Sequence, residues 1–67
     1  MNANQIAHLM HAITQAYFRG EVEVGEYTGI AEALVSQARE AGIRDEAMTA
    51  YNQMCLAWHA RSEASAA

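Results

Sequence analysis

The sequence predicts a small all-α protein, either a three-helix bundle or a helical hairpin followed by a third helix. The 67-residue chain contains no proline, and 52% of it is apolar, with alanine prominent. Alanine loses no side-chain entropy in a helix, whereas proline would remove a backbone donor and clash. Apolar residues also recur every three to four positions in three stretches. We predict one domain over residues 1–67, with helices over residues 4–19, 26–41 and 46–61 and a frayed tail over 62–67.

The first helix is predicted from a stripe of large apolar side chains. At about 100° per residue these side chains share one arc of the helix, opposite His8 and His11. The stripe consists of Ile6, Leu9, Met10, Ile13 and Tyr17. The side-chain oxygen of Asn2 or Asn4 can cap the first free N–H groups. Gly20 then provides a left-handed stop.

The second helix follows the same spacing and has matching end signals. Its predicted buried stripe is Tyr27, Ile30, Ala31, Leu34, Ala38 and Ala41. Glu26 in the first turn and Arg39 in the last complement the helix dipole. Gly29 weakens the helix and suggests a close helix crossing. Gly42 followed by Ile43 is typical of a Schellman ending.

The third helix is predicted to begin with Asp45 as its N-cap and Glu46 in its first turn. Its stripe is Ala47, Tyr51, Met54 and Trp58, flanked by Met48 and Cys55. Leu56 falls on the other side. Because both breaks between helices are short, consecutive helices should be antiparallel neighbours.

The segment 20–25 alternates glutamate and valine between two glycines. We interpret it as a connector whose valines pack onto the helices; the alternative is a short strand that pairs with its copy in a dimer. Glu21, Glu23 and Glu26 form an acidic cluster that could dock a basic surface or mimic nucleic-acid phosphates. A solvated connector is the simpler interpretation, because mimicry requires a denser array of acids.

Size and cysteine content favour self-association. A chain this short buries only about 60% of the surface that its unfolded form exposes. Its single cysteine excludes an internal disulfide and fits a reducing, cytoplasmic environment. Small domains often reach stability by oligomerising, so we predict a homodimer. Its interface is expected at the apolar residues left over by the stripes, Phe18, Val22, Val24 and Leu56.

One set of residues could hold a metal. His8 and His11 share one helix, Cys55 and His59 another, and four such ligands suit tetrahedral zinc. In an antiparallel three-helix chain, however, these two pairs lie toward opposite ends. We therefore predict no metal or other cofactor within one chain, with a metal at an intermolecular contact as the alternative. Cys55 with His59 as base lacks a third orienting group, so no catalytic residue and no enzyme activity are predicted.

Charge and hydropathy limit the class of partner. The net charge is −4, there is no lysine among the four basic residues, and the arginines are scattered, which argues against direct nucleic-acid binding. Residues 30–51 superficially resemble a helix-turn-helix, yet the second helix opens with acids. No apolar run is long enough to span a membrane, and the start of the chain lacks a signal-peptide pattern.

The function predicted from these observations is a protein–protein interaction module. We expect an acidic helical protein that binds and modulates or inhibits a larger protein. Its size would suit an accessory protein of a phage or mobile element, although no residue supports that source. The alternatives are a metal-binding helical protein and a transcription regulator that acts through a protein partner.

Overall fold

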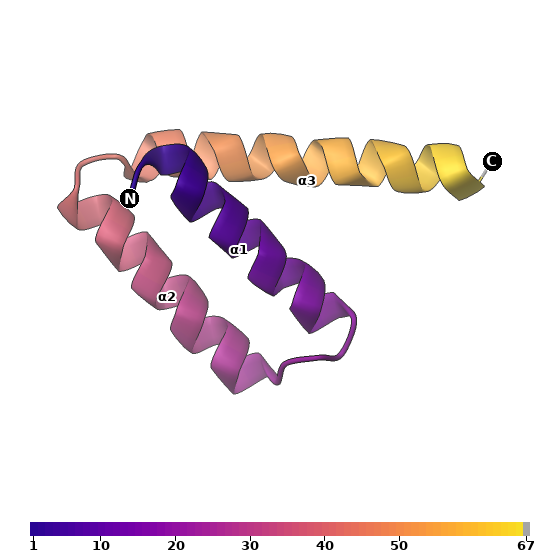
Figure 1. The fold of residues 1–67 in the computed structure, drawn as a ribbon, viewed down its shortest axis with the longest axis horizontal. Helices are drawn as coiled ribbons and strands as arrows, with labels where there is room; N and C mark the ends of the chain where they lie inside the picture. Colours follow the sequence, from indigo (N-terminus) through magenta and orange to yellow (C-terminus); the bar gives the residue numbers. More distant parts are fainter. Residues whose placement is uncertain (67) are drawn as a thin grey trace.

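Three helices make up the protein. The computed structural model describes residues 1–66, with side chains through residue 62. Helix α1 spans Ala3–Phe18, α2 spans Val24–Glu40 and α3 spans Arg44–Ala66. Within residues 1–66 there is no strand, so the all-α prediction is confirmed. Pairing of the connector with a second copy stays a prediction, limited to residues 20–23 because α2 begins at Val24. Helices α1 and α2 form an antiparallel hairpin, and α3 starts beside α1 and diverges from it (Figure 1).

Both ends of α1 are fixed by the residues that the sequence indicates. The Asn2 side chain accepts a hydrogen bond from the Gln5 N–H at 2.9 Å, and the Gln5 side chain accepts one from the Asn2 N–H at 2.9 Å. This capping box satisfies two backbone donors at the helix start. At the other end Gly20 has a φ of 77°, and the Glu21 N–H donates to the Ala16 carbonyl at 2.9 Å. This Schellman geometry confirms the predicted stop.

Helix α2 begins two residues earlier than predicted and ends as expected. Val24 is therefore the first residue of α2 and is exposed, so the prediction that it packs from a connector is wrong. Gly42 has a φ of 72°, and the Ile43 N–H donates to the Ala38 carbonyl at 2.9 Å, which confirms the Schellman ending. The prediction of a close helix crossing at Gly29 is wrong, because a Cβ there would meet nothing within 4 Å.

Helix α3 is longer at both ends than predicted. It starts at Arg44, so Asp45 lies in the first turn and is not the N-cap. It continues to Ala66, and the predicted frayed tail is therefore helical through that residue; residue 67 lies outside the described part. No glycine or proline interrupts residues 44–66, and alanine favours continuation of the helix.

The core is small and lies where the three helices meet. Its buried residues are Ile6, Ala7, Met10, Leu34, Ala38 and Ala47. Four residues predicted to be in the buried stripes are exposed, namely Leu9, Ile30, Ala41 and Trp58. The exposed fractions of Leu9 and Ile30 are 47% and 44%. Helix α1 packs against both other helices, so its buried face is centred near Met10. Leu9 then lies at the margin of that face, beside Ile30.

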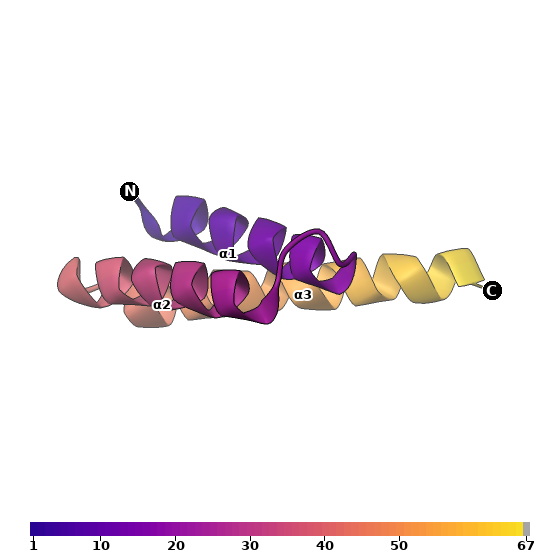
Figure 2. The same ribbon diagram turned by 90° about the horizontal axis from the view of Figure 1, so that it is seen from below.

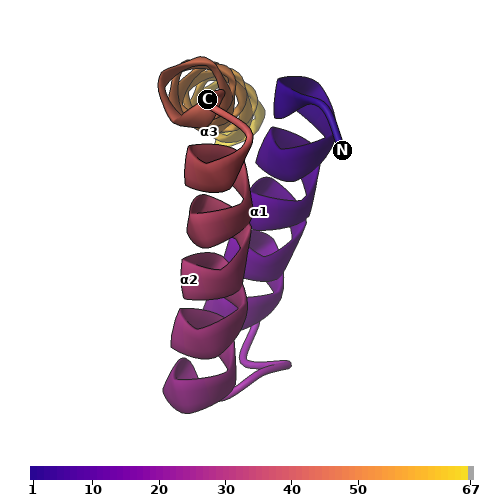
Figure 3. The same cartoon turned by 90° about the vertical axis from the view of Figure 1, so that its left-hand side faces the viewer.

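The three helices form a bundle-like arrangement that is open on one side. Helix α3 packs mainly on α1 and touches α2 least, so only α1 and α2 are the antiparallel neighbours that were predicted. The Cα envelope measures 42 × 25 × 13 Å, and the far end of α3 extends beyond the hairpin (Figures 1 and 2). Viewed from the side, α3 lies across one end of the hairpin (Figure 3). Among the described residues, no helix is long and apolar enough to cross a membrane.

Candidate interaction surfaces

A single hydroxyl group links the three helices. Thr14 Oγ1 donates to the Met10 carbonyl at 2.8 Å and lies 3.0 Å from Tyr51 Oη and 3.3 Å from Tyr27 Oη. A threonine hydroxyl has one proton and two lone pairs. Because its proton is used by Met10, both tyrosines donate to Thr14, and its hydrogen-bonding capacity is filled. This link was not predicted from the sequence, where the only signal is a threonine bordering the apolar stripe of α1.

Burial and stacking make this link rigid and poorly suited to proton transfer. Burial raises the pKa of the Tyr51 hydroxyl above its ordinary value of 10.0, and the nearby Cys55 raises it further. Tyr51 therefore stays protonated near neutral pH and acts as a donor. Tyr27 stacks on Tyr17 with ring centroids 4.8 Å apart. We assign this cluster a structural role.

The first surface is an apolar groove between α1 and α2. It has a volume of about 310 Å³, and no charged residue lines it. Its lining residues, which define the apolar groove, are Leu9, Ala12, Ile13, Ile30 and Leu34. Three of the four large side chains among them are only partly buried or exposed. The sequence pattern assigned them to the core, and the open arrangement of the helices leaves them accessible instead.

The second surface is a notch between α1 and α3. It has a volume of about 250 Å³ and is lined by His8, His11, Gln15, Met54, Ala57, Trp58 and Arg61. His11 is half-buried, and its ring meets Tyr51 edge-on with centroids 6.5 Å apart. The prediction that His11 points away from the packed side is therefore wrong. The notch combines two imidazoles, a guanidinium group and an indole with no acidic side chain.

The four residues considered for zinc are not brought together. His8 and His11 lie along α1 beside the notch, whereas Cys55 is half-buried near Tyr51 and the ring of His59 packs against Trp58 at 5.3 Å. Among the described residues, no group of three or more histidine, cysteine or acidic side chains is arranged to hold a metal ion.

The residues predicted to form an interface are scattered. Phe18 and Val24 are exposed near the turn of the hairpin, and Val22 in that turn is half-buried. Leu56, whose exposed fraction is 69%, lies two residues from both Met54 and Trp58. It therefore points about half a turn away from the notch. The four residues do not make one continuous patch.

The acidic residues near the turn are dispersed and solvated. Glu21 forms an ion pair with Arg19 at 3.0 Å, and both side chains are mostly exposed. Glu23 precedes α2 as its N-cap residue without a side-chain capping bond, and Glu26 lies in the first turn. Exposed ion pairs contribute little stability, and Glu26 complements the helix dipole. These local interactions account for Glu21 and Glu26, whereas Glu23 makes no side-chain capping bond.

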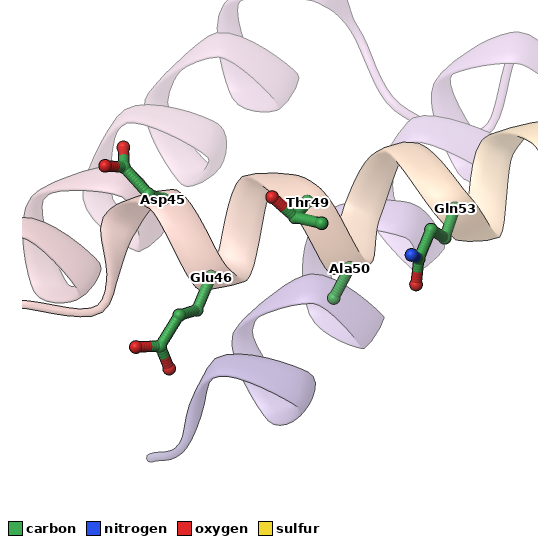
Figure 4. Close-up of a pocket in the computed structure, with 5 residues that line it drawn as sticks. All are labelled: Asp45, Glu46, Thr49, Ala50 and Gln53. Carbon is green, nitrogen blue, oxygen red and sulfur yellow. The ribbon is translucent and has the colours of Figure 1, made fainter.

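A shallow depression on α3 is not a binding site. It is lined by Asp45, Glu46, Thr49, Ala50 and Gln53, all from this one helix. Figure 4 shows their side chains along α3, the helix that supplies all five lining residues. An enclosed ligand site needs convergent groups from more than one element. The groove and the notch flanking α1 are therefore the candidate sites.

Comparison with known proteins adds no further assignment: no family model matches the chain, and neither a curated protein nor a solved structure is detectably similar to it.

Proposed function

We propose that this chain is a protein–protein interaction module that associates with itself and binds and modulates a larger protein. The observation that carries the proposal is the apolar groove, in which Leu9 and Ile30 stay open to solvent on opposite helices. Grouped apolar side chains on a surface are typical of contact sites. Neither alternative function is favoured by a comparable observation.

The groove suits an amphipathic helix on the partner. Two antiparallel helices with an apolar furrow between them can accept side chains spaced three or four residues apart on a third helix. Burial of such side chains contributes about 0.8 kcal/mol per methylene group. The uncharged lining indicates that the inserted side chains are aliphatic or aromatic.

The test uses capture of the partner by the full chain, followed by titration of the purified partner. The double variant Leu9→Ser/Ile30→Ser removes apolar surface from both walls of the groove. Leu56→Ser is the control, because Leu56 is also a large apolar residue and is more exposed than Leu9 or Ile30 but lies outside the groove. We expect the groove variant to bind the partner about tenfold more weakly or worse, and the control to bind like the parent.

Circular dichroism spectra of all three proteins verify that helicity is retained. Equal binding by the groove variant and the parent would contradict the proposal that the partner binds in the apolar groove. Failure of the parent to retain any specific protein would contradict binding to a larger protein.

A further inference from the structure

Helices α1 and α3 begin as a closely packed pair in matching register. Ala7 on α1 and Ala47 on α3, forty positions apart in the sequence, are both buried. Four residues further along each helix, His11 and Tyr51 meet edge to face. Small residues let helix backbones approach closely, and a spacing of four keeps side chains on one face. The two helices therefore share one contact stripe over their first turns.

The same stripe ends in two exposed aromatic residues. Phe18 and Trp58 each follow the buried alanine of their helix by eleven residues, which is about three turns. Their exposed fractions are 72% and 39%, and their ring contacts are with their own sequence neighbours, Tyr17 and His59. The helices have therefore diverged before this level, and each arm of the opening carries a large aromatic side chain.

The far half of α3 lacks cover. Helix α3 has 23 residues and α1 has 16, which correspond to lengths of about 35 and 24 Å. We call residues 56–66 the overhang, and its side chains from Leu56 through Ser62 are all exposed. A helical stretch of this length is marginal in water without tertiary contacts. The overhang is thus a segment that needs a surface to pack on.

The molecule as a whole is more open than its mass requires. A folded monomer of 7.3 kDa exposes about 4,200 Å², whereas this chain exposes 4683 Å². Its radius of gyration is 12.7 Å, compared with about 11 Å for a typical domain of this length. The excess of roughly 480 Å² is more than half of the roughly 800 Å² that each subunit of a standard interface buries.

We infer that a second copy of this chain fills the notch with its own overhang, running antiparallel, while the first copy's overhang fills the second copy's notch. This inference rests on the proposed self-association and assigns it to one surface. In this two-fold symmetric arrangement the overhang and the notch of each copy are both covered. No further copy can then be added, so the assembly is a closed dimer. Met54 and Arg61 border the contact, which places the axis near Ala57.

Charge favours the antiparallel direction. In the antiparallel arrangement the overhang of the second copy enters the notch with its C-terminal end leading. The C-terminal end of a helix carries about half of an elementary negative charge. Among the described residues, Arg61 is the one charged side chain that lines the notch, so the lining is complementary to that end. In a parallel insertion the C-terminal end of the overhang would point away from the notch.

The first test compares the mass of the full chain and of variants by light scattering across a range of concentrations. The double variant Phe18→Ser/Trp58→Ala removes one aromatic side chain from each arm, and Leu56→Ser is the control on the outward face of α3. We expect the parent and the control to be dimers and the dissociation constant of the double variant to rise about 30-fold or more. A monomeric parent, an unaffected double variant or dissociation of the control would each overturn the inference.

The second test is disulfide trapping, which does not depend on destabilising the fold. In a Cys55→Ser background, Ala57→Cys places one thiol near the two-fold axis, and Ala12→Cys places one on α1 outside the notch. Disulfides form only when Cα atoms lie within about 7 Å, so mild oxidation should link two copies through position 57 and not through position 12. The reverse pattern, or no linking at 57 at a concentration where the mass is doubled, would overturn the inference.

The two proposals fail in distinguishable ways. A parent chain that is monomeric but still captures a larger protein refutes the notch assignment and leaves the groove proposal standing. A parent chain that is a dimer but captures no larger protein refutes the groove proposal and leaves the notch assignment standing. The Leu9→Ser/Ile30→Ser variant should remain a dimer, and its dissociation would place self-association in the apolar groove and contradict the notch assignment.

Discussion

The two ends of the α1–α3 pair differ in how far their apolar side chains are buried within the chain. At the closed end, Ala7 and Ala47 let the backbones approach, and Ile6 is completely enclosed by the neighbouring helices. At the open end, Phe18 and Trp58 occupy the same stripe but are exposed, and their ring contacts are with their sequence neighbours Tyr17 and His59. One periodic pattern thus produces a folded core at one end and an unsatisfied surface at the other. We assign stability to the closed end and recognition to the open end.

Among the substitutions that test this difference between the two ends, Ile6→Ala is expected to lower the free energy of unfolding most. Ile6 is the largest fully buried side chain among the described residues, and truncation of such a residue costs about 2–5 kcal/mol. In a domain this small that loss can exceed the total free energy of unfolding. We expect thermal denaturation followed by circular dichroism to show a greatly lowered melting temperature. Leu9→Ala, at the exposed margin, should cost about 1 kcal/mol or less, and equal effects of the two changes would contradict the placement of the core.

The next effect is expected from Thr14→Val, which keeps the shape of the side chain and removes the hydroxyl. Tyr27 and Tyr51 then lose their common acceptor, and an unpaired, partly buried polar group costs about 1–3 kcal/mol. Urea denaturation measures the change. Tyr27→Phe, which removes only the longer of the two tyrosine bonds, should cost less. If it costs more than Thr14→Val, Thr14 is not the centre of the cluster.

The sequence predicts the helices better than their packing. Helices α1 and α2 end before Gly20 and Gly42 because each ending needs a residue with positive φ, which glycine adopts readily. This need depends only on neighbouring residues, so it can be predicted from the sequence. Which side of α1 is buried depends on α1 having two neighbours, and this non-local fact moves Leu9 to the margin. The hydrogen-bonding role of Thr14 could not be predicted from periodicity, because it depends on two tyrosines that are distant in the chain.

The open end was the hardest part to predict for the same reason. Phe18 was expected at an interface because it falls outside the main apolar stripe, and its exposure agrees with that placement. Trp58 was assigned to the core because its spacing from Ala47 is correct for a buried stripe. Only the divergence of α3 from α1 leaves it open, and no residue-level pattern encodes the angle between two helices.

A smaller effect is expected from alkaline pH, and it probes the closed end. The unfolded chain releases the Tyr51 proton near pH 10, whereas the folded chain holds it to higher pH because burial raises its pKa. The folded state therefore binds more protons above about pH 10, and its stability falls as the pH rises. This contribution is fully present below that pH. Urea denaturation at a series of alkaline pH values should show a shallower decline for Tyr51→Phe than for the parent; identical slopes would mean that Tyr51 is not shielded.

The most direct test of the division between a closed and an open end uses the fluorescence of Trp58, the only tryptophan in the chain. Trp58 lines the notch, so its emission reports whether a second copy covers it. We predict that, as the protein concentration rises, the emission shifts to shorter wavelength with the same midpoint as the doubling of mass, and that Phe18→Ser moves both midpoints together. A doubling of mass with an unchanged emission spectrum would place the interface elsewhere and contradict the account.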